Sequence, residues 1–226
     1  MLDTRVSDLG MDRDGNSMAL PAGTGQYSCS SWIKSITPMD TETKTVLKRK
    51  ADNADGKISL QPNEIKKMSV EMNVPYGVNG GRYSIVLFEA AGSSQISMDG
   101  LLLKGRVGSL IMLDLYGRRT LNAEVNQFRA DHENANVNFK MIVKNTGDTH
   151  FRMACSIIIK KEGKIIDRVS ADVGTGTVLP GYEREFTAMW KNERKMIPGA
   201  YYAELRVRIP GLGKYIRKEI EFNIHK

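Results

Sequence analysis

The chain has 226 residues, 41% of them hydrophobic and 26% charged, and these fractions exclude a chain that is disordered along its whole length. The formal net charge of +7 would suit an anionic partner, but most basic residues alternate with acidic ones along predicted strands, as Glu204, Arg206 and Arg208 do. Alternating charge of this kind is typical of a solvent-exposed sheet face. The basic residues also have no aromatic residues interleaved with them, so we expect no nucleic-acid partner.

The sequence contains no stretch of about 20 apolar residues, so it predicts no transmembrane segment. Residues 1–14 include four Asp and lack the apolar core of a signal peptide. Taken by themselves, these residues indicate a cytoplasmic protein.

Apolar and polar residues alternate with a period of two over much of the chain, whereas helical periodicity is almost absent. The predicted fold class is therefore all-β. In the first half, strands are predicted at 31–36, at 68–74 before a proline, and at 83–87 after two glycines. The run 110–113 is apolar at every position, which predicts a strand covered on both faces or a helical turn, and the apolar residues around it favour the strand.

The second half of the chain alternates more regularly. It predicts about seven short strands, which lie at 121–128, 137–143, 151–159, 165–173, 186–190, 201–209 and 216–224. Asn, Gly and Pro residues separate several of these segments, as in 145–148, and such residues are typical of turns between strands.

The two halves share a pattern of residues at a constant distance of 118 positions, as between Pro62 and Pro180 (180 − 62). The same distance relates Gly81 to Gly199, Tyr83 to Tyr201, Leu87 to Leu205, and the apolar residues Met68, Val70 and Met72 to Phe186, Ala188 and Trp190. Each copy therefore predicts a turn at proline, an alternating strand, a glycine turn and a strand that begins with tyrosine.

The residue types of the repeat suit these structural roles. Proline fixes the backbone angle φ of a turn, glycine permits a positive φ, and tyrosine can bury its ring while its hydroxyl bonds to the backbone. A tyrosine after such a corner braces immunoglobulin-like sandwiches. We therefore expect two tandem immunoglobulin-like β-sandwich domains, at 1–117 and 118–226. One continuous sandwich would not need a repeat.

Several short motifs resemble those of a known family. They are Leu60-Gln61-Pro62-Asn63-Glu64, Gly80-Gly81-Arg82-Tyr83, Asn145-Thr146-Gly147, Val178-Leu179-Pro180-Gly181 and Pro198-Gly199-Ala200-Tyr201. The first half resembles the N-terminal domain of periplasmic pilus-chaperone-like (PapD-like) proteins and of two-domain surface proteins that interact with WxL proteins. The second half is similar to the immunoglobulin-like domain that follows in such proteins. The resemblance implies a periplasmic or cell-surface protein that binds polypeptides, as in pilus assembly.

The resemblance also implies two opening strands ahead of the segment that matches Val6 to Trp32. Residues 3–15 include four Asp and two Gly, so they cannot supply both strands. We expect either a start that has lost these strands together with a secretion signal, or a first sandwich that is naturally strand-deficient. In pilus chaperones, basic residues hold the C-terminus of the bound pilin, and Arg118 or Arg119 is a positional candidate for one of them.

The sequence offers no catalytic, cofactor-binding or metal-binding motif. Cys29 and Cys155 lie far apart and have no Cys or His at ligand spacing, which favours two free thiols over a disulfide between the domains. His132, His150 and His225 likewise have no further ligands at suitable spacing. Turn or surface positions are the better interpretation of these histidines.

Two aspartate-rich segments, 12–16 and 52–56, resemble calcium loops but lack the distal Glu of an EF-hand, so we expect hairpin turns. The segment 174–177 lacks the Lys of a phosphate loop. Ser97 and Ser170 lack the glycines that flank a hydrolase nucleophile. No enzyme class is therefore predicted.

These observations together predict a non-enzymatic protein of the cell envelope that uses no cofactor or metal. We expect it to bind another polypeptide through sheet edges or the interdomain cleft, as a chaperone-like or surface-adhesion module. A sandwich that lacks strands exposes an unpaired edge, which a strand from a partner can complete. The alternative is a structural subunit of a filament or large envelope assembly, completed by strand exchange with neighbouring copies.

Overall fold

The computed structural model describes residues 1–39, 57–90, 96–98, 101–103, 105–133, 136–174, 176–191 and 197–225. These residues form several antiparallel sheets, which confirms that the protein is all-β. The chain divides into two compact units. The first unit contains Met1–Gly10 and Met18–Gly117, and the second contains Met11–Ser17 and Arg118–Lys226.

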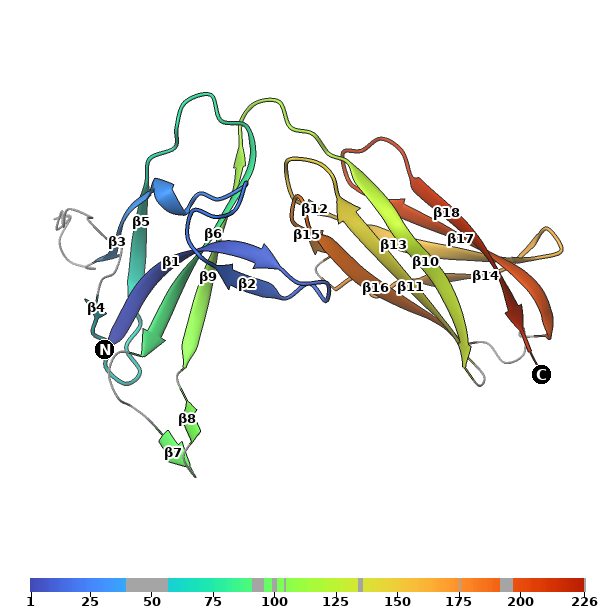
Figure 1. Cartoon of the computed structure of the whole chain (residues 1–226), viewed down its shortest axis with the longest axis horizontal. Coiled ribbons are helices and arrows are strands. Elements are labelled where there is room, and N and C mark those ends of the chain that lie inside the picture. Colours follow the sequence, from blue (N-terminus) through green and yellow to red (C-terminus); the bar gives the residue numbers. More distant parts are fainter. Residues whose placement is uncertain are drawn as a thin grey trace. The chain divides into compact units, whose positions relative to one another are not determined.

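The described residues of the first half form strands β1 to β9 (Figure 1). Their bounds are Leu2–Met11 (β1), Ser17–Leu20 (β2), Ile33–Met39 (β3), Lys57–Ile58 (β4), Lys67–Met72 (β5), Gly80–Ala90 (β6), Ile96–Met98 (β7), Leu101–Leu103 (β8) and Arg106–Leu115 (β9). The larger sheet has the strand order β2-β1-β6-β9, with β4 beside β1. Strands β3 and β5 form a separate two-stranded sheet, and β7 pairs with β8.

Strand β1 is an element that the sequence pattern does not predict, and its Asp8 is only 2% exposed. A buried carboxylate is costly unless it is paired. Here the loop after β2 supplies the partners, because the N–H groups of Gly23 and Gly25 donate to Asp8 over 3.0 and 2.7 Å and the Ser28 hydroxyl donates as well. Burial alone would raise the pKa of Asp8, but the hydrogen bonds from Ser28 and Gly25 outweigh it and hold this pKa below its usual value.

The segment 12–16 forms the tight turn between β1 and β2, as predicted. The N–H of Gly15 donates to the Asp12 carbonyl over 3.1 Å, and the N–H of Asn16 donates to the Asp12 carboxylate over 2.8 Å. Gly15 has a φ of 87°, which glycine adopts without a steric cost. The aspartate therefore stabilises a turn. The second aspartate-rich segment, 52–56, lies outside the described residues.

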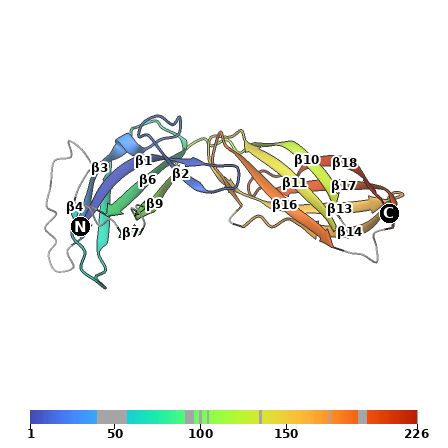
Figure 2. The same cartoon turned by 60° about the horizontal axis from the view of Figure 1, so that its bottom comes forward.

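The second unit contains two facing sheets, seen as two layers in Figures 1 and 2. Its strands are Ala123–Glu133 (β10), Asn136–Asn145 (β11), Phe151–Arg152 (β12), Ala154–Lys161 (β13), Lys164–Ser170 (β14), Thr177–Val178 (β15), Glu183–Lys191 (β16), Gly199–Arg208 (β17) and Ile216–Ile224 (β18). One sheet has the order β10-β11-β16 and the other has the order β14-β13-β17-β18, while β12 pairs with β15. The architecture of this unit is sandwich-like.

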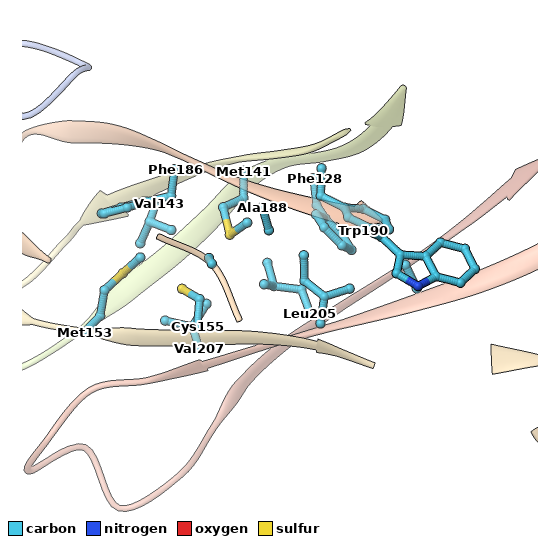
Figure 3. Close-up of a cluster of buried hydrophobic side chains, with 14 of the residues drawn as sticks. Phe128, Met141, Val143, Met153, Cys155, Phe186, Ala188, Trp190, Leu205 and Val207 are labelled. Carbon is cyan, nitrogen blue, oxygen red and sulfur yellow. The ribbon is translucent and has the colours of Figure 1, made fainter. Parts of the chain in front are cut away.

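The core of the second unit lies between its two sheets and follows from the period-two alternation. The predicted inward residues of β11 are all 0% exposed: Val137, Phe139, Met141 and Val143. Buried side chains of the other sheet complete the same cluster. Figure 3 shows side chains of the two layers facing each other, with Met141, Val143, Phe186 and Ala188 on one side and Cys155, Leu205 and Val207 on the other.

The stretch 151–159 is two elements instead of the single predicted strand. Its inward residues are buried as expected, but β12 pairs with β15 whereas β13 pairs with β14 and β17. Met153 separates the two strands, and its N–H donates to the carbonyl of Gly176 over 3.2 Å. The chain changes its pairing partner here without interrupting the apolar alternation, so the sequence pattern does not mark the break.

Strand β9 confirms the strand predicted at 110–113, but the expected coverage of both faces is wrong. It lies at the end of the β2-β1-β6-β9 sheet, where Val107 and Leu110 are 70% and 46% exposed. A continuous apolar run is buried on both faces only where layers cover it, and these two residues remain largely open to solvent.

Both copies of the repeat contain a turn with proline at its second position, at Pro62 and Pro180. The turn at 61–64 is closed by a backbone hydrogen bond of 3.1 Å between its end residues, and its third residue, Asn63, has a φ of 65°. The turn at 179–182 is closed in the same way over 3.1 Å, and its third residue, a glycine, has a φ of 82°. These features define type II turns, so both prolines have the structural role that the repeat predicts.

Tyr201 has the bracing role that the repeat predicts. It is 0% exposed, and its ring packs edge-on against Trp190 with 5.6 Å between centroids. Its hydroxyl donates to the carbonyl of Ile197 over 2.7 Å and accepts from the N–H of the same residue over 3.0 Å. The hydroxyl thus fixes the chain just before β17 begins.

The glycines before the two tyrosines also have identifiable roles. Gly199 has a φ of 137°, which only glycine adopts readily. Tyr83 is 2% exposed, and its hydroxyl would lie 1.9 Å from a Cβ atom at Gly81. A side chain at Gly81 would therefore displace the Tyr83 hydroxyl.

Glu204 is a carboxylate on the outer face of β17 that is only 5% exposed. Arg206 and Lys160 donate hydrogen bonds to it, the latter over 2.6 Å, and these bonds lower the pKa of Glu204 to about 2. The pKa of glutamate in an unfolded chain is about 4.3. Because the folded state binds this proton less tightly, the cluster stabilises the fold above about pH 4.3, and the contribution is lost as the pH falls through the folded pKa.

We expect Glu204→Gln to remove this part of the pH dependence. Denaturant unfolding followed by circular dichroism, at neutral pH and near about pH 3, should show a smaller loss of stability on acidification in the variant than in the unmodified chain. Glu221→Gln changes an exposed carboxylate on the neighbouring strand β18 and serves as the control. Equal acid sensitivity of Glu204→Gln and the unmodified chain would contradict the role assigned to Glu204.

Candidate interaction surface

Strand β5 carries a row of apolar side chains that is only partly covered. Met68, Val70 and Met72 alternate with polar residues, so they share one face of the strand. Val70 is 38% exposed, and the two methionines are half-buried. These three residues are called the apolar row of β5 below.

The matching residues of the second unit are fully covered. Phe186, Ala188 and Trp190 lie 118 positions later in the sequence and are 3%, 6% and 2% exposed. Strand β11 pairs with β16 along this whole row, and its inward side chains complete the core beside it. The apolar row of β5 thus has the pattern of a core strand, but the described residues include no neighbour that buries it as β11 buries the row of β16.

The pairing of β5 with β3 identifies which edge of β5 is free. The N–H of Asn73, directly after β5, donates to the carbonyl of Trp32, directly before β3, over 2.7 Å, and the residue 118 positions after Asn73 is Lys191. Lys191 and Thr187 are four positions apart in β16, so their backbone N–H and C=O groups point to the same edge. That edge faces away from β11, because the Thr187 carbonyl accepts there from the N–H of Asp172 over 3.2 Å. Strand β3 therefore occupies the matching edge of β5. The other edge, equivalent to the β11 side of β16, has no neighbouring strand among the described residues and is called the open edge of β5.

The outer edge of β3 is less suited to strand addition. Pro38 lies in β3 opposite Met68, and proline has no N–H to donate. Proline in a sheet occurs on edge strands with its nitrogen directed away from the paired neighbour, so Pro38 interrupts the hydrogen-bonding groups on the outer edge of β3. Addition of a strand to this sheet is therefore favoured at the open edge of β5.

The second unit covers the corresponding place with its own chain. Strand β11 lies beside β16, and β10 lies beside β11. The side chain of Lys218 in β18 then donates to the carbonyls of Val125 and Asn126 in β10, over 2.9 and 3.0 Å. These contacts occur where the β10 ladder shifts register, and they occupy carbonyl groups that an exposed edge would leave unpaired.

The larger sheet of the first unit also exposes apolar surface. Leu110 of β9 is the register partner of Ile85 and shares its face, but Ile85 is 6% exposed whereas Leu110 is 46% exposed. In the second unit, Ala203 occupies the place of Ile85, and its register partner in β18 is Ile220. Ile220 packs against the core. Leu110, at the matching position of the first unit, is therefore more exposed to solvent than Ile220.

Arg118 and Arg119 lie exposed in the segment between β9 and β10. Their assignment to the C-terminus of a bound polypeptide stays a prediction. The residues Pro62, Pro180, Gly81 and Gly199 shape turns and corners, as described above. The open edge of β5 is a separate feature. The sequence predicted an unpaired edge in the first sandwich from its resemblance to a known family, but it did not assign that edge to β5.

Cys29 and Cys155 are free and buried, at 0% and 6% exposed, in agreement with the prediction of two free thiols. Burial raises the pKa of both thiols, to about 12 for Cys155. The sulfur of Cys29 lies 3.1 Å from the hydroxyl oxygen of Ser84. Both thiols are protonated at neutral pH and act as small core side chains.

Within the described ranges, no cluster of His, Cys, Asp and Glu side chains could hold a metal ion. In the same ranges, no helix has the length and apolar character needed to cross a membrane. No family model, no curated protein and no solved structure matches the chain. The function is therefore inferred from the chain's own geometry.

Proposed function

We propose that each unit is a variant of the immunoglobulin-like sandwich and that the described part of the first unit lacks the two strands that would lie beside β5. The sheets β2-β1-β6-β9 and β14-β13-β17-β18 support this equivalence, because β6 and β17 are related by the repeat and occupy the same place in the strand order. In the second unit β11 and β10 follow β16 in the remaining sheet. The described residues provide no counterpart of these two strands beside β5.

The function that this geometry supports best is non-enzymatic binding of a β-strand from another polypeptide at the open edge of β5. The observation that carries the proposal is the exposure of Val70, which is 38% against 6% for Ala188 at the matching position. An added strand would pair with the free backbone groups and cover the apolar row of β5. Such a protein acts as a chaperone-like or adhesion module of the periplasm or cell surface, as the resemblance to pilus-chaperone-like proteins implies.

Strand addition at this edge has a sufficient driving force. Each new backbone hydrogen bond contributes about 0.5–1.5 kcal/mol net. Covering an exposed aliphatic side chain contributes about 1.5–3 kcal/mol, and less for a side chain that is already half-buried. Part of this gain offsets the lost freedom of the incoming segment. We therefore expect dissociation constants in the micromolar range for a short strand.

A second copy of the chain is the alternative partner, as in a structural subunit of a filament. Strand β5 can pair antiparallel with β5 of a second copy so that the two Val70 residues lie opposite each other. Met68 of one copy then lies opposite Met72 of the other, and Ser69 lies opposite Glu71. This register buries both apolar rows and brings no like charges directly opposite each other. Self-association of the chain would favour this alternative.

In the isolated chain, we expect the backbone amides of β5 to exchange with solvent much faster than those of β16, because β3 is the only strand that pairs with β5 among the described residues. Hydrogen exchange of the full chain measures both strands in one experiment, and sedimentation velocity at micromolar concentration gives its size. Fast exchange in a monomer supports a strand acceptor, and polymers with a protected β5 favour the self-completing subunit. A monomer whose β5 is protected as strongly as β16 would overturn the proposed function.

Short synthetic peptides with alternating apolar residues are expected to slow exchange in β5 of the unmodified chain. The same peptides should bind Val70→Lys at least about tenfold more weakly, because the variant places a charge within the face that the added strand buries. Met189→Lys is the matched control, since Met189 lies on the outer face of β16 and is 46% exposed. Circular dichroism establishes that both variants are folded.

A further inference from the structure

We propose that the open edge of β5 selects an antiparallel strand with three medium-sized aliphatic residues on its inner face and, on its outer face, a basic residue first and an acidic residue last. This inference rests on the proposed function and names the kind of polypeptide segment that the site binds. Two separate features of β5 carry it, namely the sizes of its inward side chains and the charges on its outer face.

The direction and register of the bound strand follow from the second unit, where β11 runs antiparallel to β16. Two neighbouring inward pairs there combine a large side chain with a small one: Trp190 lies opposite Val137, and Ala188 lies opposite Phe139. Interiors are packed at a nearly constant density. The two members of each pair therefore share a roughly fixed space, and a larger residue on one strand requires a smaller residue on the other.

The inward residues of β5 are more even in size than those of β16. Val70 takes the place of Ala188, so it leaves room for a residue smaller than phenylalanine. Met72 takes the place of Trp190, so it leaves room for a residue larger than valine. The positions opposite Val70 and Met72 are therefore best filled by leucine, isoleucine or methionine. Met68 takes the place of Phe186, which lies opposite Met141, so the third position takes a residue of at least this size.

The outer face of β5 sets the order of the charges. Lys67 begins the strand, Glu71 lies near its end, and both are exposed. In an antiparallel pair, directly opposed residues of opposite charge attract each other. The first outward residue of the incoming strand faces Glu71 and the last faces Lys67. Both direct and diagonal pairs of opposite charge occur in the second unit. Lys144 of β11 lies directly opposite Glu183 of β16, and the Lys140 ammonium lies 3.9 Å from the carboxylate of its diagonal neighbour Glu185.

The bound segment therefore has a specific pattern from its N-terminus to its C-terminus. An aliphatic residue opposite Met72 is followed by Lys or Arg opposite Glu71, and an aliphatic residue opposite Val70 is followed by Ser or Thr opposite Ser69. An aliphatic residue opposite Met68 then precedes Asp or Glu. This order distinguishes the site from a surface that accepts any alternating strand.

A pair of peptides tests the predicted order of charges. The matching peptide contains Leu-Lys-Leu-Thr-Leu-Glu, and the charge-exchanged peptide contains Leu-Glu-Leu-Thr-Leu-Lys, each with the same neutral flanks and a fluorescent label. We expect the full chain to bind the matching peptide about tenfold more tightly at low salt, because two attractive cross-strand pairs are exchanged for two repulsive ones. The difference should shrink at high salt, since these charges lie at the surface.

The double variant Lys67→Glu with Glu71→Lys is the decisive control. It keeps the composition and the apolar row of β5 and reverses only the order of the two charges, and circular dichroism establishes that it is folded. We expect it to prefer the charge-exchanged peptide by a similar factor. Hydrogen exchange in β5 reports in each case whether the peptide occupies this edge.

The possible outcomes separate the inference from the function beneath it. If both peptides protect β5 equally in the unmodified chain, the edge binds strands without the proposed order of charges, and the inference fails while the function stands. If neither peptide protects β5 and alternating peptides of other composition also fail, the proposed function itself is wrong. A preference that reverses in the double variant supports both.

Discussion

We expect Trp190→Ala to lower the free energy of unfolding of the second unit by about 3–5 kcal/mol. Trp190 is 2% exposed, and its ring lies 5.6 Å from that of Tyr201 and 6.5 Å from that of Phe222, measured between centroids. Its indole N–H donates to the carboxylate of Asp167 over 3.1 Å. Truncation removes these contacts and leaves a cavity between two sheets that cannot collapse freely, because β16 and β17 are each held by paired strands.

Denaturant unfolding followed by far-ultraviolet circular dichroism measures this loss without relying on tryptophan fluorescence. Met189→Ala is the matched control, because Met189 precedes Trp190 in β16, lies on the opposite face of the strand and is 46% exposed. We expect it to change stability by no more than about 0.5 kcal/mol. A loss below about 1 kcal/mol for Trp190→Ala would contradict the core described for the second unit.

The second large effect is expected for Asn145→Asp. This variant should destabilise the second unit more than Asn145→Ala does, although aspartate is closer to asparagine in size. Asn145 is 0% exposed, and its amide nitrogen donates to the carbonyls of Thr149 and Val178, each over 2.9 Å. Its amide oxygen accepts from the N–H of Gly147 over 2.9 Å. Alanine loses these bonds, at about 1 kcal/mol each. Aspartate additionally places an oxygen against two carbonyl oxygens and buries a charge.

Because the two variants change the same residue, the order of their stabilities tests the hydrogen bonds of the Asn145 amide. We expect about 2–3 kcal/mol for Asn145→Ala, and a larger loss for Asn145→Asp at neutral pH that decreases at acidic pH as the carboxyl takes up a proton. Asn223→Asp makes the same chemical change at an exposed site of β18 and is the control. Equal stability of Asn145→Asp and Asn145→Ala at neutral pH would mean that the amide does not make the bonds described.

The second unit was largely predictable because each of its long strands has one buried face. Val137, Phe139, Met141 and Val143 alternate with more polar residues, and a period of two places them on the side that packs against the opposite sheet. The repeat likewise identified Tyr201 and the prolines of the two type II turns, since each residue type has few alternative roles at such positions. Local sequence and tertiary packing agree in these segments.

The first unit was harder to predict because its pattern depends on contacts between distant residues. Strand β1 contains Asp8, whose burial is possible only because Gly23, Gly25 and Ser28 donate to it from a loop elsewhere in the sequence. The apolar run of β9 indicated burial, yet Leu110 is 46% exposed. A sequence pattern specifies which face of a strand is apolar, but whether another layer covers that face depends on the rest of the fold.

The apolar row of β5 was predictable from the sequence only in part. Its alternation was visible in the sequence, and its match to Phe186, Ala188 and Trp190 indicated a core strand. Which edge of β5 is open became apparent only from the hydrogen bond between the N–H of Asn73 and the carbonyl of Trp32, which places β3 on one particular side of β5. The most informative feature of the candidate site is therefore a difference between two copies of one pattern, and neither copy reveals it alone.

The position of Pro38 has a consequence for stoichiometry. Because this proline interrupts the outer margin of β3, addition of a strand to the small sheet is favoured on one side, at β5. Among the described residues, this small sheet then offers one favoured docking edge, so the proposed function predicts a one-to-one complex with a partner strand. A protein with two equally receptive margins would instead link its clients into chains.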